Sequence, residues 1–206
     1  MRWNWKAWLF VAFIAYCGWH YWKTLPPPVP SGIAAAEDPR QTPVGRPPLL
    51  RLRNYQVEAL AEFSIKARVL SVEYYDTDRV SEISPMDFIL GWGLMSDPDV
   101  YSRVKFSQHD RFGFWHTADA SIPLRALEQH SANMHMVPAN DSVARQLKKI
   151  KKEQLIALSG YLIEIRADDG WYWRSSLTRD DTGPGACELV WVDAVDLNPG
   201  SDSDHE

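Results

Sequence analysis

The sequence has few of the patterns that mark metal sites, disulfide frameworks or common enzyme classes. There are only two cysteines among 206 residues, Cys17 and Cys187, and no recognisable zinc motif is present. Cys17 falls within an apolar N-terminal run, so we expect no intramolecular disulfide. A Gly-x-Ser-x-Gly elbow is absent. The glycine-containing segment 182–185 lacks the lysine of a phosphate-binding loop and is better explained as a turn.

Positive charge is scarce in the larger part of the chain. Residues 1–53 contain seven Lys/Arg and two Asp/Glu, whereas residues 54–206 contain fifteen and twenty-five. The net charge therefore changes from +5 to −10 between the two parts. An acidic body repels nucleic acid, so we expect no nucleic-acid partner. The basic run 148–152 is expected to be the solvated face of a helix.

The segment 1–23 predicts a transmembrane helix. Residues 3–22 are mostly apolar and would span roughly 30 Å as a helix, close to the thickness of a bilayer core. Interfacial aromatic residues stand at both ends: Trp3, Trp5 and Trp8, then Trp19, Tyr21 and Trp22. Arg2 and Lys6 precede the apolar run, and Lys23 alone closely follows it. This asymmetry predicts a cytoplasmic N-terminus.

A cleaved signal peptide is the alternative for this segment. Small residues should follow its apolar core, but His20, Tyr21 and Trp22 occupy that place. Residues 14–17 resemble a lipoprotein signal except that Tyr16 precedes the cysteine. We therefore expect an uncleaved, single-pass signal-anchor. In a bacterium with two membranes, it would lie in the inner membrane and place the body in the periplasm.

A proline-rich linker, a single globular domain and a short tail are expected to follow. Eight of the fourteen prolines fall within residues 24–53, which favours an extended spacer. Residues 54–197 are sufficient for one domain with its own core. The acidic segment 198–206 lacks apolar residues and predicts a disordered tail.

Hydrophobic patterning in the domain favours β-structure. Alternation predicts strands over 62–75 and 154–166, and Asp168-Asp169-Gly170 predicts a turn that returns through 171–173 as a hairpin. Further strands are expected over 111–116 and 188–195. Asn140 or Asp141 is a suitable cap for a helix over 141–151. Residues 83–130 show no clear period, although Ser84-Pro85 suggests a short helix from Met86.

This order of strands, with one helix before the hairpin, resembles the small β-barrel of the oligonucleotide/oligosaccharide-binding (OB) type. The resemblance covers roughly residues 57–195 and concerns element order only. It implies a mainly-β (α+β) domain: an OB-like barrel with one helix near 141–151, preceded by the transmembrane helix and the linker. Residues 83–130 do not fit it.

Two polar blocks carry the candidate site, residues 130–135 and 175–188. They resemble blocks of single-pass, membrane-anchored bacterial proteins of uncharacterised function, and that resemblance implies no activity. The residues predicted as binding candidates are His130, Ser131, Asn133, His135, Trp171, Trp173, Arg179 and Asp181. Tyr161 and Tyr172 extend the aromatic set, which suits either a sugar- or peptide-binding surface or cross-strand pairs in a barrel wall.

A metal site would need His130 and His135 to converge with His109 or His116 and an acid. Because the first two are five residues apart, neither a helix nor a strand aligns them. We expect these imidazoles to satisfy backbone groups of a turn, and we predict no metal and no cofactor. Cys187 precedes the apolar run 189–192 and is expected to be a buried structural thiol.

These features favour a membrane-anchored, extracytoplasmic binding or assembly module over an enzyme. Its partners would be the lipid bilayer through residues 3–22 and a protein of the cell envelope. The alternative is a periplasmic hydrolase or metal-dependent enzyme that uses His130, His135 and Cys187. Ser131, Ser175 and Ser176 give weaker grounds for a hydrolase. A third possibility is a structural component whose contacts run through the anchor helix.

Overall fold

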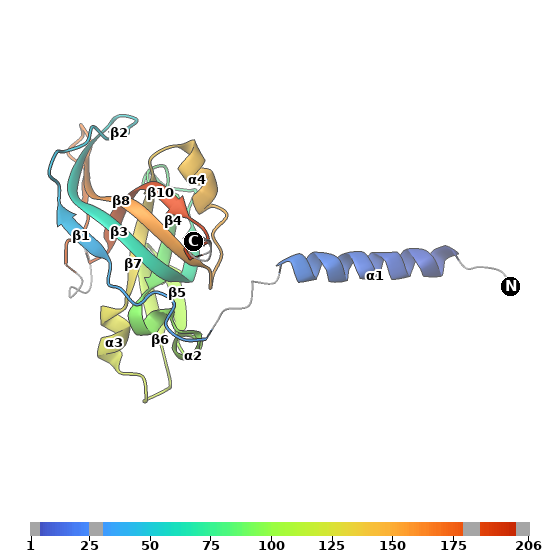
Figure 1. Cartoon of the computed structure of the whole chain (residues 1–206). Helices are drawn as coiled ribbons and strands as arrows, with labels where there is room; N and C mark the ends of the chain where they lie inside the picture. The colour runs from blue at the N-terminus through green and yellow to red at the C-terminus, as the bar shows by residue number, and fades with distance from the viewer. Residues whose placement is uncertain (1–4, 25–30, 179–185, 201–206) are drawn as a thin grey trace, which may run out of the picture.

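Strands are the predominant regular structure outside one long N-terminal helix (Figure 1). The computed structural model describes residues 5–24, 31–178 and 186–200. The helices are α1 (Trp5–Thr24), the 3₁₀ helix η1 (Gly93–Ser96), α2 (Pro98–Tyr101), α3 (Leu124–Gln129) and α4 (Asp141–Leu147). The strands are β1 (Arg40–Pro43), β2 (Arg51–Leu52), β3 (Tyr55–Tyr74), β4 (Met86–Gly91), β5 (Lys105–His109), β6 (Phe112–His116), β7 (Ser131–Pro138), β8 (Leu155–Arg166), β9 (Tyr172–Arg174) and β10 (Glu188–Asp196). The predicted mainly-β class is confirmed.

The large sheet has the strand order β1-β3-β4-β7-β10-β8-β9, with β2 on β3 and a further pairing between β3 and β8. Pairings therefore run from β3 through β4, β7, β10 and β8 and return to β3. The β7–β10 pairing is parallel, whereas the other four are antiparallel. Strands β5 and β6 form a separate two-stranded sheet.

Alternation along the sequence predicted the two longest strands. β8 agrees with the predicted strand 154–166 to within one residue. β3 covers the predicted 62–75 but begins earlier, at Tyr55. The additional residues at the start of β3 pair with β8, because the β3–β8 ladder extends from Gln56 opposite Arg166 to Arg68 opposite Leu155. The predicted hairpin is also present, since β9 pairs with β8.

Helix α4 begins where the sequence predicted and ends earlier. The Asn140 side chain accepts hydrogen bonds from the backbone N–H groups of Ser142 and Val143, at 2.9 and 3.1 Å. Such a cap satisfies donors that have no partner inside the helix. After Leu147 the backbone hydrogen bonds join residues three apart, as in a 3₁₀ turn, and one of them runs from the Ile150 N–H to the Leu147 carbonyl. The predicted end at 151 is therefore wrong by one turn.

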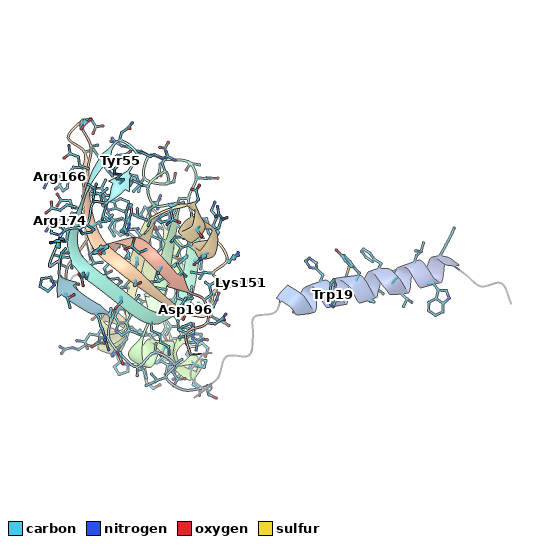
Figure 2. All side chains as sticks on the ribbon, turned by 45° about the horizontal axis from the view of Figure 1, so that its top comes forward. Trp19, Tyr55, Lys151, Arg166, Arg174 and Asp196 are labelled. Atoms are coloured by element: carbon cyan, nitrogen blue, oxygen red, sulfur yellow. The ribbon has the colours of Figure 1, made fainter. Side chains whose placement is uncertain are left out.

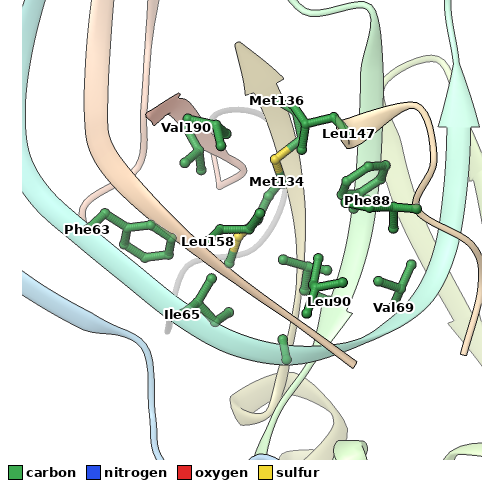
Figure 3. Close-up of a cluster of buried hydrophobic side chains, with 14 of the residues drawn as sticks. Phe63, Ile65, Val69, Phe88, Leu90, Met134, Met136, Leu147, Leu158 and Val190 are labelled. Atoms are coloured by element: carbon green, nitrogen blue, oxygen red, sulfur yellow. The ribbon is translucent and has the colours of Figure 1, made fainter. Parts of the chain in front are cut away.

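The main core lies between the strands of the large sheet (Figure 3). Alternate residues of β3, β4, β7, β8 and β10 contribute to it, so that Phe88 and Leu90 of β4 lie in one cluster with Met134 and Met136 of β7. The helix α4 adds Leu147, which is fully buried. Residues at the alternate positions therefore point to the outer face of the sheet.

Residues 83–130 hold the largest departure from the sequence-based description. The short helix expected from Met86 is wrong, because these residues form β4, and all six of them are buried. A strand buried on both faces shows no alternation, which removes the signal that periodicity relies on. Beyond β4, the segment η1–α3 folds into a second core cluster around Met95 and Leu127.

The β5–β6 hairpin of this segment packs against the outer face of the large sheet. A Cβ placed on Gly113 would lie 2.8 Å from the Asn133 Cβ and 3.2 Å from the Ile89 side chain. Glycine is therefore required where the hairpin crosses β4 and β7. The hairpin brings its turn, Asp110-Arg111, onto the same face as His135.

The segment expected to span a membrane is helical, as α1. Among the described residues, however, no helix has both the length and the apolar character that crossing a bilayer requires. The transmembrane helix predicted for 1–23 is thus not found. The physical reason lies in the composition of α1, because Trp, Tyr, His and Lys make up nine of its 20 residues and carry polar atoms.

Residues 31–53 of the proline-rich segment do not form an extended spacer. Its second half carries β1, which pairs with β3, and β2. Ala35 is buried, and its N–H donates to the Ser96 hydroxyl at 3.0 Å. The Trp92 indole N–H donates to Asp38 at 3.0 Å. Residues 31–53 therefore pack on the domain, while the expected tail lies mostly outside the described residues.

Candidate functional site

Two strands and the residue before a third place an aspartate, a histidine and a cysteine on the outer face of the sheet. Asp87 of β4 stands directly opposite His135 of β7. On the other side of β7, Leu189 of β10 stands opposite His135 in parallel register. Cys187, two residues before Leu189, therefore shares this face and lies beside the Asn133–His135 stretch. We call Asp87, Arg111, Asn133, His135 and Cys187 the polar cluster.

Asp87 is the centre of the charges in the polar cluster. Its carboxylate is fully buried, with Oδ2 at 3.0 Å from His135 Nδ1 and Oδ1 at 3.1 Å from Arg111 Nη1. The same Arg111 nitrogen donates to the Ser84 carbonyl at 2.8 Å. The Arg111 guanidinium lies 3.6 Å from the centre of the Tyr75 ring. One buried carboxylate is thus shared by two cationic side chains, as a buried charge requires.

The surroundings of His135 favour its protonated form. Burial lowers its pKa, but the interactions of the ring with the side chains of Asp87 and Cys187 outweigh that effect and raise the pKa to about 9. Near neutral pH the ring is therefore an imidazolium. On Tyr75, burial and the charge of Asp87 raise the pKa to about 12, so that this phenol remains neutral.

Cys187 is partly exposed and is surrounded by polar groups. Its Sγ lies 3.6 Å from Asn133 Nδ2 and 4.0 Å from the Arg111 carbonyl oxygen. The same Asn133 nitrogen donates to the Arg111 carbonyl at 3.0 Å, and Asn133 Oδ1 accepts from Gln108 at 2.8 Å. These contacts fix the Asn133 amide beside the thiol.

An aromatic cluster, which we define as Tyr55, Arg79, Trp171 and Trp173, adjoins the polar cluster. The Arg79 guanidinium lies 4.8 Å from the centre of the Trp171 ring and 5.4 Å from that of Tyr55. The rings of Trp171 and Trp173 are 6.4 Å apart and meet edge to face. Trp173 also packs on His135, with ring centres 4.8 Å apart. Trp173 therefore connects the aromatic cluster to the buried His135.

The structure separates the predicted histidine pair. His130 caps the end of α3 with Nδ1 at 3.0 Å from the Ala126 carbonyl, and His135 contacts Asp87 instead. The neighbouring Ser131 hydroxyl donates to the Leu127 carbonyl at 2.7 Å. Within the ranges that the structure describes, no three His, Cys, Asp or Glu side chains are arranged to hold a metal ion.

The other predicted site residues lie in different environments. Trp171, Trp173, Asn133 and His135 lie in the two clusters defined above. Tyr172 is 66% exposed, and Tyr161 packs against a third cluster of buried apolar side chains, which includes Val137 and Ile163. Ser175 is buried, with its hydroxyl bonded to backbone groups. Arg179 and Asp181, together with the turn 182–185, lie outside the described residues.

Sequence reasoning missed Asp87 and Arg111. The signal for Asp87 was present: it is the only charged residue in the otherwise apolar strand β4, and a buried carboxylate needs partners. Arg111 gave no comparable signal, because it belongs to a turn whose distance from Asp87 depends on the tertiary fold. Its φ of 69° also departs from ordinary strand geometry.

The site can therefore offer a ligand an aromatic surface that carries the exposed Arg79–Asp169 ion pair, and beside it a buried ion pair next to a partly exposed thiol. Comparison of the chain with protein-family models, with curated proteins and with solved structures gave no match.

Proposed function

We propose that the chain is a binding module of the OB type, and that it binds an extended segment of a partner protein at the aromatic cluster. The observation that carries this proposal is the position of the cluster. Arg79 comes from the β3–β4 connection, and Trp171 and Trp173 come from the β8–β10 connection. In OB-type barrels, the loops between the first two strands and between the last two strands bind the ligand.

The strand order supports the OB assignment. The pairings that return from β8 to β3 join five strands, β3, β4, β7, β8 and β10. Helix α4 lies between the third and fourth of them in chain order. The β5–β6 hairpin and its neighbouring helices then represent an insertion between the second and third strands. This insertion explains why residues 83–130 did not fit the pattern of the family.

The charge and the sheet edge favour a polypeptide ligand. The acidic body repels nucleic acid, as its net charge of −10 indicates. Strand β9 stands at the end of the strand order, and it carries the exposed Tyr172 between the two tryptophans. A sheet edge can accept an extended peptide through backbone hydrogen bonds, with neighbouring side chains providing specificity. Trp171 and Arg79 are suited to hold such a segment.

Site-specific photo-crosslinking in cells tests this proposal. A photoreactive residue at Tyr172, which is 66% exposed, should form a discrete adduct with one protein. The matched control is the same residue at Leu124, which is 58% exposed and belongs to α3, at the opposite end of the domain in Figure 1. The control should give no such adduct.

The variant Trp171→Ala should remove the Tyr172 adduct while circular dichroism of the purified chain stays unchanged. A Tyr172 adduct that persists in Trp171→Ala, or one that also forms at Leu124, would contradict the proposal. An adduct that contains glycan and no protein would do so as well.

We also propose that α1 attaches this module to the cytoplasmic membrane, with the body on the periplasmic side. What supports this is the exposure of large apolar side chains around the helix, among them Trp8, Phe10, Phe13 and Trp19. Aromatic side chains partition to the membrane interface.

Flotation of the full chain with vesicles should be lost when Phe10 and Phe13 become serine. A membrane-impermeant maleimide should label Leu177→Cys on intact spheroplasts, in a variant without other cysteines. Labelling only after lysis would contradict the periplasmic placement.

A further inference from the structure

We propose that a patch of exposed lysines docks the domain on a bilayer surface that contains anionic phospholipids. We call it the lysine patch and define it as Lys148, Lys149, Lys151, Lys152 and the adjoining Tyr74. The inference rests on the proposed attachment of α1 to the membrane, which brings the domain near that surface. It goes further because it assigns a second membrane contact, on the domain itself, and with it an orientation of the domain.

The lysine patch reverses the charge of the body locally. Residues 141–152 contain five Lys/Arg and one Asp/Glu, a net of +4. The rest of the body, residues 54–140 and 153–206, contains ten Lys/Arg and twenty-four Asp/Glu, a net of −14. An anionic bilayer repels most of this body and attracts the patch. The domain can therefore approach such a bilayer closely only with the patch facing it.

The four lysine side chains are available to an external anion. All four are exposed, two at the end of α4 and two in the connection to β8. The ion pairs formed within residues 5–24, 31–178 and 186–200 use other cations. The negative end of the helix dipole accounts for lysines at 148 and 149. It does not account for Lys151 and Lys152, which lie beyond the last turn.

The backbone under the lysine patch is fixed to the domain. Ile150, in the middle of the run, is 3% exposed and belongs to the main core. The Glu153 N–H donates to the Val69 carbonyl at 2.7 Å, and the Lys151 N–H donates to the Gln154 side chain at 3.2 Å. The lysines are therefore displayed on a preorganised surface, so that docking requires little ordering of the backbone.

The nearest carboxylates in the sequence leave the patch cationic. Glu153 follows Lys152 directly, but it is partly buried and its charge acts on Arg68, whose pKa it raises against the effect of burial. Asp141 lies at the other end of α4. Neither carboxylate forms an ion pair with a lysine of the patch within the part of the chain that the structure describes.

An exposed aromatic ring borders the lysines. Tyr74, at the end of β3, is 49% exposed, and its hydroxyl donates to the Lys148 carbonyl at 3.4 Å. Tyrosine rings enter the headgroup layer of a bilayer, and lysine stems extend along apolar surface while their ammonium groups contact lipid phosphates. The combination of one ring with four lysines favours a lipid surface as the partner of the patch.

The length of the chain before the domain keeps the patch close to the bilayer. Seven peptide bonds separate Thr24, the last residue of α1, from Ser31, and they span at most about 25 Å. A membrane-bound α1 therefore holds the domain near the lipid headgroups. Figure 2 shows Lys151 and Tyr55 toward opposite sides of the domain. With the patch on the bilayer, the aromatic cluster remains accessible to a partner protein.

Co-sedimentation of the full chain with vesicles tests the docking. Neutral vesicles contain phosphatidylcholine alone, and anionic vesicles also contain about 30% phosphatidylglycerol. We expect a larger partition coefficient for the anionic vesicles. The double variant Lys151→Gln/Lys152→Gln should reduce that coefficient by roughly tenfold to thirtyfold and leave binding to neutral vesicles unchanged. In about 1 M salt, where the Debye length is about 3 Å, the preference for anionic vesicles should disappear.

The matched control is Lys66→Gln/Lys105→Gln, which removes two exposed lysines from β3 and β5 and should have little effect. An equal preference for anionic vesicles in the two double variants would overturn the docking and leave the attachment by α1 intact. Lysine-dependent binding to heparin with no preference for anionic vesicles would overturn it as well. No binding to neutral vesicles, with a preference that still depends on Lys151 and Lys152, would support the docking and overturn the attachment by α1.

A second measurement locates the contact on the domain. An environment-sensitive fluorophore on Tyr74→Cys, in a chain whose two native cysteines are serine, should gain fluorescence on anionic vesicles. The control label at Leu124→Cys, a position that is 58% exposed in α3, should not gain fluorescence. Circular dichroism confirms that both labelled chains are folded. Equal gains at the two positions, or no gain at position 74, would overturn the docking of this patch.

Discussion

The imidazole of His135 and the carboxylate of Asp87 meet at 3.0 Å from directly opposed positions of β7 and β4, on the outer face of the sheet. The other oxygen of the same carboxylate contacts Arg111. The buried carboxylate of Asp87 therefore contacts both the opposite strand β7 and the turn of the β5–β6 hairpin. Because such a charge is tolerated only when it is paired, the polar cluster links the segment 93–130 to the main sheet.

Replacing Asp87 by asparagine should destabilise the protein by about 3–5 kcal/mol, because it leaves Arg111 and His135 without their counter-charge. Urea unfolding followed by tryptophan fluorescence measures the loss. The control is Asp169→Asn, which breaks the exposed pair with Arg79 and should leave the unfolding midpoint unchanged. Equal effects of the two substitutions would show that the Asp87 pairing is not important for stability.

Stability should fall as the pH rises from about 6.5 to about 9. The pKa of His135 is about 9 in the folded protein and near 6.5 in an unfolded chain, so the folded state binds the proton more tightly. The resulting stabilisation is complete below about pH 6.5 and disappears as the pH passes through about 9. Urea midpoints across this range check the trend.

His135→Gln supplies the control for this pH dependence. The variant should have a smaller slope over the same range, while His130→Gln should retain the slope of the unmodified chain. Since both substitutions remove one histidine, a difference between them identifies the group that titrates.

Gly160→Ala should destabilise the protein by at least about 1–3 kcal/mol. The added Cβ would lie 1.9 Å from the Trp191 carbonyl oxygen, where β8 and β10 pair around a register shift. Backbone must move to remove this clash. Gly45→Ala is the matched control, because nothing lies within 4 Å of its Cβ position. Thermal unfolding of both variants decides the point, and equal midpoints would contradict the close approach.

Asn140→Ala should cost about 1 kcal/mol through loss of the α4 cap. Its Oδ1 accepts from two backbone N–H groups at the start of the helix. Ser142→Ala, two residues further along, keeps both of these bonds and should have a much smaller effect. If the two substitutions destabilise the chain equally in urea, the cap is not what stabilises the helix start.

Elements with a strong local signal were predictable from the sequence. β8 alternates apolar residues along its length, and α4 combines an Asn cap with buried Val143 and Leu147 at helical spacing. The β8–β9 turn has Gly170 with φ of 86°, a conformation that glycine adopts easily. In each case, the residues that specify the element are neighbours along the chain.

The site was less predictable, for the same physical reason. His135 and Cys187 were recognised as residue types that are often found in functional sites, yet nothing in their spacing connected them to Asp87. His130 was a plausible partner of His135 by proximity in sequence, but strand pairing brought an aspartate from a different strand instead. Pairings between strands far apart in the chain leave no local pattern.

By itself, the sequence determined the mainly-β class, the helix between two strands, the hairpin after β8 and the acidic character of the body, because periodicity, turn residues and charge act locally. The tertiary structure alone decided that residues 31–53 pack on the domain, that β4 is buried on both faces, and that Asp87, Arg111 and His135 meet. These outcomes depend on which strands pair and in which register, and the register is chosen by burial of the whole sheet rather than by any one segment.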